Sequence, residues 1–178
     1  MKSPLFKRIT IEVICLLYIL LFVYAATSKL LDFSNFQVQI AQSPLLSAYA
    51  GIIAPLVIAV EFLIVSLLWL KPLRSVGLYA SFSLMVSFTV YIYLILNYSE
   101  FIPCSCGGIL EKLGWTEHMA FNIFFILLAV LALLLTERAS GKSFRKIITV
   151  HFLCMALGTI LVIILFLSSE WTNHSKLI

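Results

Sequence analysis

Five apolar runs of about 20 residues each dominate the 178-residue chain. They are Ile9–Thr27, Gly51–Leu70, Gly77–Asn97, Met119–Thr136 and Ile147–Ser168. A run of this length that is apolar on all sides is typical of a helix that crosses a bilayer, because each backbone N–H and C=O must be paired within the segment. The pattern therefore predicts an all-α integral membrane protein, a helical bundle whose main partner is the lipid bilayer.

The composition agrees with this class. Hydrophobic residues make up 62% of the chain and charged residues 11%, whereas soluble domains are about half apolar and a quarter charged. We expect two parts, residues 1–136 with four spans and residues 137–178 with a basic loop, a fifth span and a short tail. Lys7 and Arg8 before the first span also fit a signal peptide, although the run is long for one.

Lysine and arginine are distributed unequally between the two predicted sides of the bundle. Nine lie on one side: Lys2, Lys7, Arg8, Lys71, Arg74, Arg138, Lys142, Arg145 and Lys146. Three lie on the other: Lys29, Lys112 and Lys176. Cytoplasmic loops carry the excess of basic residues. We therefore expect a bacterial inner-membrane protein with a cytoplasmic amino terminus and an extracytoplasmic carboxyl terminus. The net charge of +4 is an orientation signal and indicates no nucleic-acid partner.

Reactive side chains cluster in the polar loop between the third and fourth spans, which the charge pattern places on the extracytoplasmic side of the membrane. The loop contains, in order, Pro103, Cys104, Ser105, Cys106, Gly107 and Gly108. Two cysteines one residue apart can join only if the backbone between them bends, and a strained disulfide is easily reduced. In an oxidising compartment such a pair suits thiol–disulfide exchange.

The neighbouring glycines suggest which thiol attacks. Gly107 and Gly108 introduce a short helical turn, and the free amide groups at a helix start stabilise a thiolate. Nearby glutamates oppose this effect. We expect Cys106 to attack and Cys104 to resolve the mixed disulfide, with the direction of electron flow left open.

Two other interpretations fit the same loop. Cys104 and Cys106 can form a structural disulfide, or remain inert, in a non-catalytic assembly factor or a subunit of a membrane complex. Two thiolates also suit copper(I) or zinc, with His118 on the same side. Two cysteines and one distant histidine are a weak ligand set, so we assign no metal.

Turnover would need a second redox group. A quinone in the bilayer is one candidate, although the sequence contains no quinone motif. Cys15 and Cys154, at similar depth in the first and fifth spans, are another. Buried cysteine is more often a small apolar filler.

Glu61 falls near the middle of the second span, where a charge costs at least about 2.5 to 3.5 kcal/mol. We expect it to face the bundle interior, protonated or paired, with Ser87 at matching depth as its partner. It fits either a proton relay or a hydrogen bond that fixes helix packing. Glu12, at the start of the first span near Lys7 and Arg8, is expected to form an interfacial ion pair.

Apolar residues recur at helical spacing after the first span, at Leu30, Phe33, Phe36 and Ile40. They predict a helix that lies along the membrane surface and stops at Pro44.

The stretch Ser28–Phe36, the acid Glu61 and the loop Cys104–Gly107 together resemble the DoxX-like membrane proteins, and more closely their MauE branch. The resemblance covers four of the five spans, from about Tyr18 to Thr136. It implies a small inner-membrane protein for the redox maturation of exported proteins in a methylamine-utilisation setting. The implied partner is a thioredoxin-like protein or an exported substrate that contains cysteine. The fifth span departs from the four-helix family core.

Overall fold

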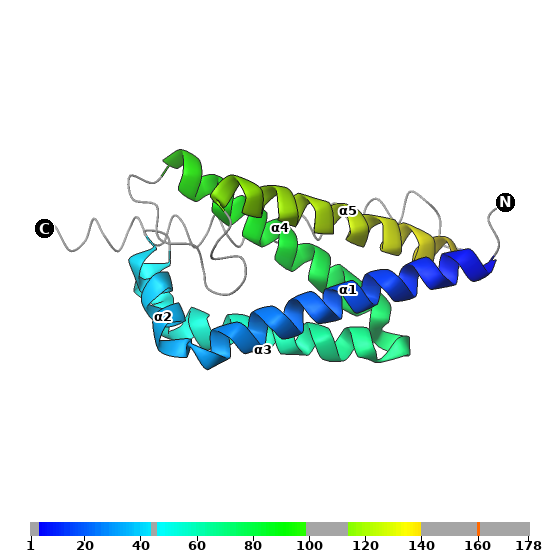
Figure 1. The fold of residues 1–178 in the computed structure, drawn as a ribbon, viewed down its shortest axis with the longest axis horizontal. Coiled ribbons are helices and arrows are strands. Elements are labelled where there is room, and N and C mark those ends of the chain that lie inside the picture. The colour runs from blue at the N-terminus through cyan, green and yellow to red at the C-terminus, as the bar shows by residue number, and fades with distance from the viewer. Residues whose placement is uncertain (1–3, 44–45, 99–113, 140–159, 161–178) are drawn as a thin grey trace, which may run out of the picture.

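The structure is a computed structural model that describes residues 4–43, 46–98, 114–139 and 160. Within these residues the chain forms helices and no strand (Figure 1). The elements are α1 (Pro4–Leu31), α2 (Phe33–Gln42), η1 (Ser47–Tyr49), α3 (Ala50–Trp69), η2 (Lys71–Leu73), α4 (Arg74–Tyr98) and α5 (Trp115–Ala139). The predicted all-α membrane bundle is confirmed.

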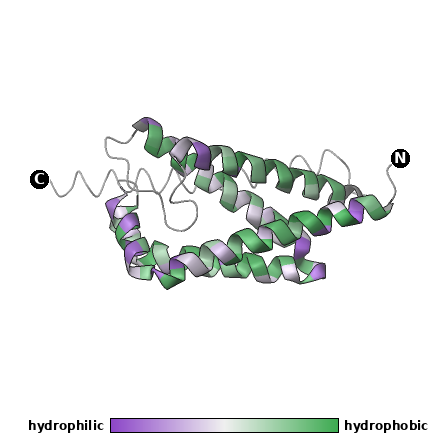
Figure 2. Cartoon of the chain, viewed as in Figure 1, coloured by the Kyte–Doolittle hydropathy of each residue, from purple (hydrophilic) through white to green (hydrophobic). Residues whose placement is uncertain are grey.

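Among the described residues, four segments are long and apolar enough to cross a membrane. They are Leu5–Leu31, Ser47–Trp69, Lys71–Asn97 and Trp115–Thr136. Less than half of each apolar stretch is buried inside the protein, and Figure 2 shows hydrophobic residues over most of these helices. The protein is therefore a multi-pass membrane protein, since bilayer lipid suits such outer faces. The predicted fifth span, Ile147–Ser168, and the basic loop before it lie outside the described residues.

Two spans extend beyond the limits expected from hydropathy. Helix α1 continues to Leu31, four residues past the predicted end at Thr27. Helix α5 begins at Trp115, four residues before the predicted start at Met119. Neither extension contains a proline or glycine that would stop the helix. As a result Lys29, which the hydropathy limits place in a loop, lies within a membrane-spanning helix.

The helices run up and down and pack as neighbours, α1 against α3 and α4 against α5 (Figure 1). The short η2 turn joins α3 to α4 and brings the two helices close together. A Cβ atom on Gly77 would lie 2.9 Å from Leu68 Cδ2 and 3.0 Å from the Leu68 backbone nitrogen. A glycine is therefore needed where α4 crosses the end of α3.

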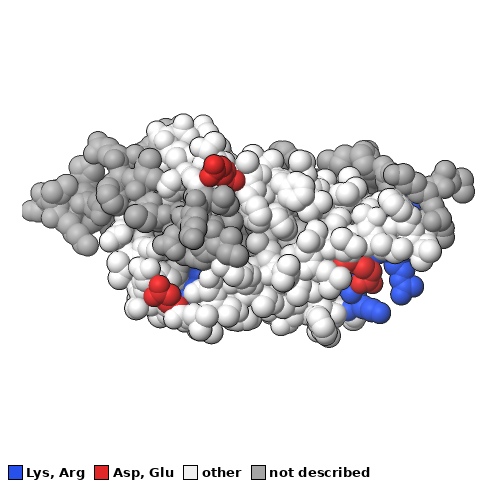
Figure 3. Space-filling model, viewed as in Figure 1, with Lys and Arg blue, Asp and Glu red and all other residues white. Residues whose placement is uncertain are grey.

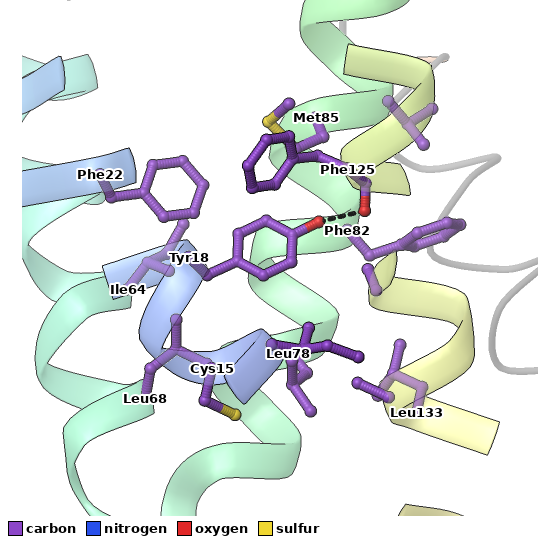
Figure 4. Close-up of a cluster of buried hydrophobic side chains, with 14 residues drawn as sticks. Cys15, Tyr18, Phe22, Ile64, Leu68, Leu78, Phe82, Met85, Phe125 and Leu133 are labelled. Atoms are coloured by element: carbon purple, nitrogen blue, oxygen red, sulfur yellow. Dashed lines mark hydrogen bonds between the residues drawn. The ribbon is translucent and has the colours of Figure 1, made fainter. Parts of the chain in front are cut away.

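A cluster of buried side chains from all four spans forms the main core, and Tyr18 lies at its centre (Figure 4). The Tyr18 hydroxyl donates a 2.6 Å hydrogen bond to the Phe125 carbonyl, which links α1 to α5. The Tyr18 ring stacks on Phe22 and meets the Phe125 ring edge-on. Cys15 is a free thiol in the same cluster and is only 1% exposed.

The predicted helix after the first span is confirmed as α2. Phe36 and Ile40 are buried against Ala26, Ala54 and Ile58, so α2 covers the end of the α1–α3 pair. Asp32 precedes α2 but makes no capping bond through its side chain; its carboxylate instead accepts a 3.2 Å hydrogen bond from the Asn35 amide.

Basic side chains gather near the amino-terminal end of α1 and the η2 turn (Figure 3). Glu12 forms its ion pair here, with Arg74 at 2.7 Å. The expected ion pair is therefore confirmed, and its partner is Arg74 because the η2 turn brings α4 beside α1. Arg74 also donates a 3.1 Å hydrogen bond to the Leu68 carbonyl. The pair therefore connects the ends of α1, α3 and α4.

Candidate functional site

Lys29 and Glu61 form a buried ion pair between α1 and α3. Lys29 Nζ lies 2.6 Å from Glu61 Oε1, and the two side chains are 9% and 2% exposed. The ammonium also lies 3.5 Å from the Ala25 carbonyl and 5.7 Å from the centroid of the Phe36 ring. The prediction that Glu61 faces the bundle interior is confirmed.

The partner predicted for Glu61 is wrong. Ser87 Oγ donates a 2.9 Å hydrogen bond to the Ser83 carbonyl of its own helix, and Lys29 takes the position beside the carboxylate. A lysine satisfies a buried carboxylate better than a hydroxyl does, because it supplies the opposite charge as well as a donor. The sequence does contain a sign of this partner. No residue after Thr27 stops the helix before Leu31, so the first span extends to include Lys29.

The ion pair lies on the wall of a cavity of about 480 Å³ between α1, α3, α4 and α5. Seven aromatic side chains line the cavity: Phe22, Tyr24, Phe88, Tyr91, Trp115, Phe121 and Phe125. The polar groups on its wall include His118 and Asn122 of α5. An apolar pocket with a few convergent polar groups is the usual form of a ligand site.

Two residues that line the cavity each have a buried polar atom with no hydrogen-bond partner among the described residues. One is Glu61 Oε2, the carboxylate oxygen that Lys29 does not contact, and the other is His118 Nδ1. An unsatisfied buried polar atom costs about 1 to 3 kcal/mol. A ligand that supplied the missing hydrogen bond would remove this cost.

The start of α5 fixes the position of His118. The Glu117 carboxylate accepts a 2.6 Å hydrogen bond from the Gly114 amide, and the His118 amide donates to the Gly114 carbonyl at 2.9 Å. Glu117 thus reaches back to the residue before the helix, as in the reciprocal half of a capping box. This anchors the first turn of α5, from which Trp115 and His118 reach the cavity.

The residues predicted to carry the chemistry, Cys104 and Cys106, lie outside the described residues, as do their neighbours Pro103, Gly107 and Gly108. Their roles stay predictions. Helix α4 ends and α5 begins at the end of the bundle where α1 also ends (Figure 1). The segment that holds the cysteines therefore joins the bundle at the end where Lys29 and Trp115 lie.

The other expectations about sulfur chemistry are untested. Cys15 is buried and free, but Cys154 lies outside the described residues, so the second dithiol stays a hypothesis. Within the described part of the chain, no group of three His, Cys, Asp or Glu side chains could hold a metal ion.

The family model described as methylamine utilisation protein MauE matches residues 7–135. The chain belongs to the MauE family. The match includes Lys29, Glu61 and the segment with Cys104 and Cys106, and it ends before the predicted fifth span. The expected relationship to MauE is thus confirmed, and the wider DoxX-like relationship stays a prediction. No curated protein and no solved structure matches the chain.

Proposed function

We propose that this MauE-family protein exchanges thiol and disulfide equivalents through Cys104 and Cys106, and so supports disulfide maturation of exported proteins. The observation that carries the proposal is the pair of cysteines, one residue apart, in the polar segment between α4 and α5. Family membership suggests a role in methylamine utilisation. The proposed partner is a thioredoxin-like protein or an exported substrate that contains cysteine.

The exchange has two balanced steps. The Cys106 thiolate attacks one sulfur of a partner disulfide, so the partner's S–S bond breaks, a mixed disulfide forms and the second partner sulfur leaves as a thiolate. The Cys104 thiolate then attacks the Cys106 sulfur, which releases the partner with both sulfurs reduced. The two electrons come from the Cys104–Cys106 dithiol, which ends as a disulfide. The reverse sequence oxidises the partner.

Two features support this assignment. First, the bundle is a multi-pass membrane protein, and the charge pattern predicts an extracytoplasmic position for the loop, where disulfides persist. Second, Cys15 is 1% exposed within the core. A buried thiol in apolar surroundings is inert, so Cys15 does not compete with the loop pair.

The proposal is tested by trapping the thiols of the protein in cells with an alkylating reagent. The Cys104–Cys106 pair should be found both as a dithiol and as a disulfide. The fraction in the disulfide form should change when the cellular redox balance is changed. A Cys104→Ser/Cys106→Ser variant should lower the yield of disulfide-bonded exported proteins, whereas a Cys15→Ala variant should keep it. Normal yield from the double variant would favour the non-catalytic assembly factor and contradict the exchange.

A further inference from the structure

We propose that the cavity beside Lys29 and Glu61 binds a neutral, lipid-soluble hydroxyaromatic ligand of the quinol class, held by a hydrogen bond from a ligand hydroxyl to Glu61 Oε2. This inference goes beyond the thiol exchange proposed above and does not depend on it, because every residue that carries it lies in α1, α3, α4 or α5.

The ion pair specifies the polar part of the ligand. Lys29 contacts Glu61 Oε1 at 2.6 Å and leaves Glu61 Oε2 buried without a partner among the described residues. A carboxylate oxygen accepts hydrogen bonds and does not donate them, so the ligand must supply the donor. A hydroxyl group meets this requirement.

The charges on the cavity wall specify a neutral ligand. The charges of Lys29 and Glu61 offset each other, and these are the lysine and the one acidic residue among the described lining. The Lys29 ammonium would repel a cationic ligand, and the Glu61 carboxylate would repel an anionic one. Both repulsions are stronger in a low-dielectric membrane protein than in water.

The other residues that line the cavity favour a ligand with an aromatic ring. Seven aromatic side chains line the cavity, and aromatic groups prefer offset-stacked or edge-on contacts with other rings. The volume of about 480 Å³ lies within the range of about 300 to 1,000 Å³ that is usual for small-molecule sites. His118 Nδ1 offers a second polar contact from a different helix, which suits a ring with more than one oxygen.

The rim of the cavity gives access from the bilayer. Leu17, Leu20 and Tyr24 of α1 line the cavity, yet they are 40%, 68% and 40% exposed. All three belong to a membrane-spanning helix, so their exposed faces meet lipid. A ligand dissolved in the membrane therefore reaches the cavity without crossing water.

Decylubiquinol is a suitable probe, with its dimethyl ether as the matched ligand that lacks a donor. Binding of each is measured by calorimetry on the full-length protein in nanodiscs, with protein-free nanodiscs subtracted. We expect saturable binding of the quinol, and binding of the ether at least about tenfold weaker, since one hydrogen bond to a charged group is lost.

Three variants complete the test. Lys29→Met/Glu61→Leu replaces the ion pair by apolar side chains and keeps the packing, and Ala25→Phe places a large side chain in the cavity while both charged residues are retained. Both should weaken quinol binding at least about tenfold. Glu12→Gln breaks the Arg74–Glu12 ion pair, neither of whose residues lines the cavity, and should leave binding unchanged. Absence of saturable binding, equal binding of quinol and ether, or wild-type binding by the first two variants would overturn the proposal.

Discussion

Lys29 Nζ and Glu61 Oε1 lie 2.6 Å apart in the membrane-spanning part of the bundle, although 32 positions separate them in the chain. Both side chains are almost fully buried. The pair therefore joins α1 to α3 at the point where their shared surface meets the cavity. Removing one partner leaves the other as an uncompensated buried charge, which is far costlier than removing both.

Lys29→Met should therefore lower the free energy of unfolding by about 3 to 5 kcal/mol, whereas Lys29→Met/Glu61→Leu should recover most of that loss. The measurement is reversible unfolding in mixed micelles, followed by circular dichroism. Glu12→Gln is the control, because the side chains of the Arg74–Glu12 pair are 19% and 35% exposed and such pairs contribute about 1 kcal/mol or less. Equal losses from Lys29→Met and Glu12→Gln would contradict this account of the buried pair.

Gly77→Ala should destabilise the bundle, because the added Cβ would lie 3.0 Å or less from Leu68 atoms that include a backbone nitrogen. Overpacking of this kind costs about 1 to 3 kcal/mol. Gly51→Ala is the matched control, since the nearest atom to its Cβ is the Gln37 side-chain nitrogen at 3.7 Å. Alanine favours a helix over glycine, so Gly51→Ala should leave the unfolding midpoint unchanged or raise it. If both variants behave alike, the α3–α4 crossing is looser than described.

Tyr18→Phe keeps the ring in the core and removes only the hydrogen bond from Tyr18 to the Phe125 carbonyl. We expect a loss of about 1 kcal/mol in the same unfolding measurement. Tyr93→Phe serves as the control because Tyr93 is 51% exposed and should show no loss. A Tyr18→Phe protein as stable as the wild type would show that this bond contributes nothing to the joining of α1 and α5.

Cys15 should resist alkylation until the protein unfolds. The chain has four cysteines, so the test uses a variant in which Cys104, Cys106 and Cys154 are replaced by serine. A membrane-permeant maleimide should modify Cys15 slowly in the folded protein and rapidly in denaturant, because the thiol is 1% exposed. Rapid labelling under native conditions would contradict the described core.

Hydropathy alone was sufficient to predict the four described spans, because a bilayer requires long apolar helices and leaves few alternatives. The ends of the spans were harder to predict, since a helix can continue into polar residues when nothing stops it. The hydropathy limits therefore place Lys29 in a loop, although it lies in α1. Glu61 was recognised because a lone acid in an apolar span is conspicuous, but its partner depends on how α1 and α3 pack. A hydrophobicity pattern does not contain that contact.

The cavity could not be predicted either. Its lining comes from four helices, and none of its aromatic residues is unusual in a membrane segment. The cysteine pair, in contrast, is visible only in the sequence, because Cys104 and Cys106 lie outside the described residues. The cavity beside Lys29 and Glu61 is thus known from the structure, and the cysteine pair is known from the sequence.

The most direct test of the proposed function is a Cys104→Ser protein, which keeps the attacking Cys106 but lacks the thiol that resolves the mixed disulfide. Cells that express it are quenched with acid and alkylated, and the membrane protein is examined on a non-reducing gel. We predict a reducible adduct with an extracytoplasmic cysteine-containing protein that disappears in the Cys104→Ser/Cys106→Ser control. Absence of any adduct, or the same adduct in the double variant, would contradict thiol exchange at this loop.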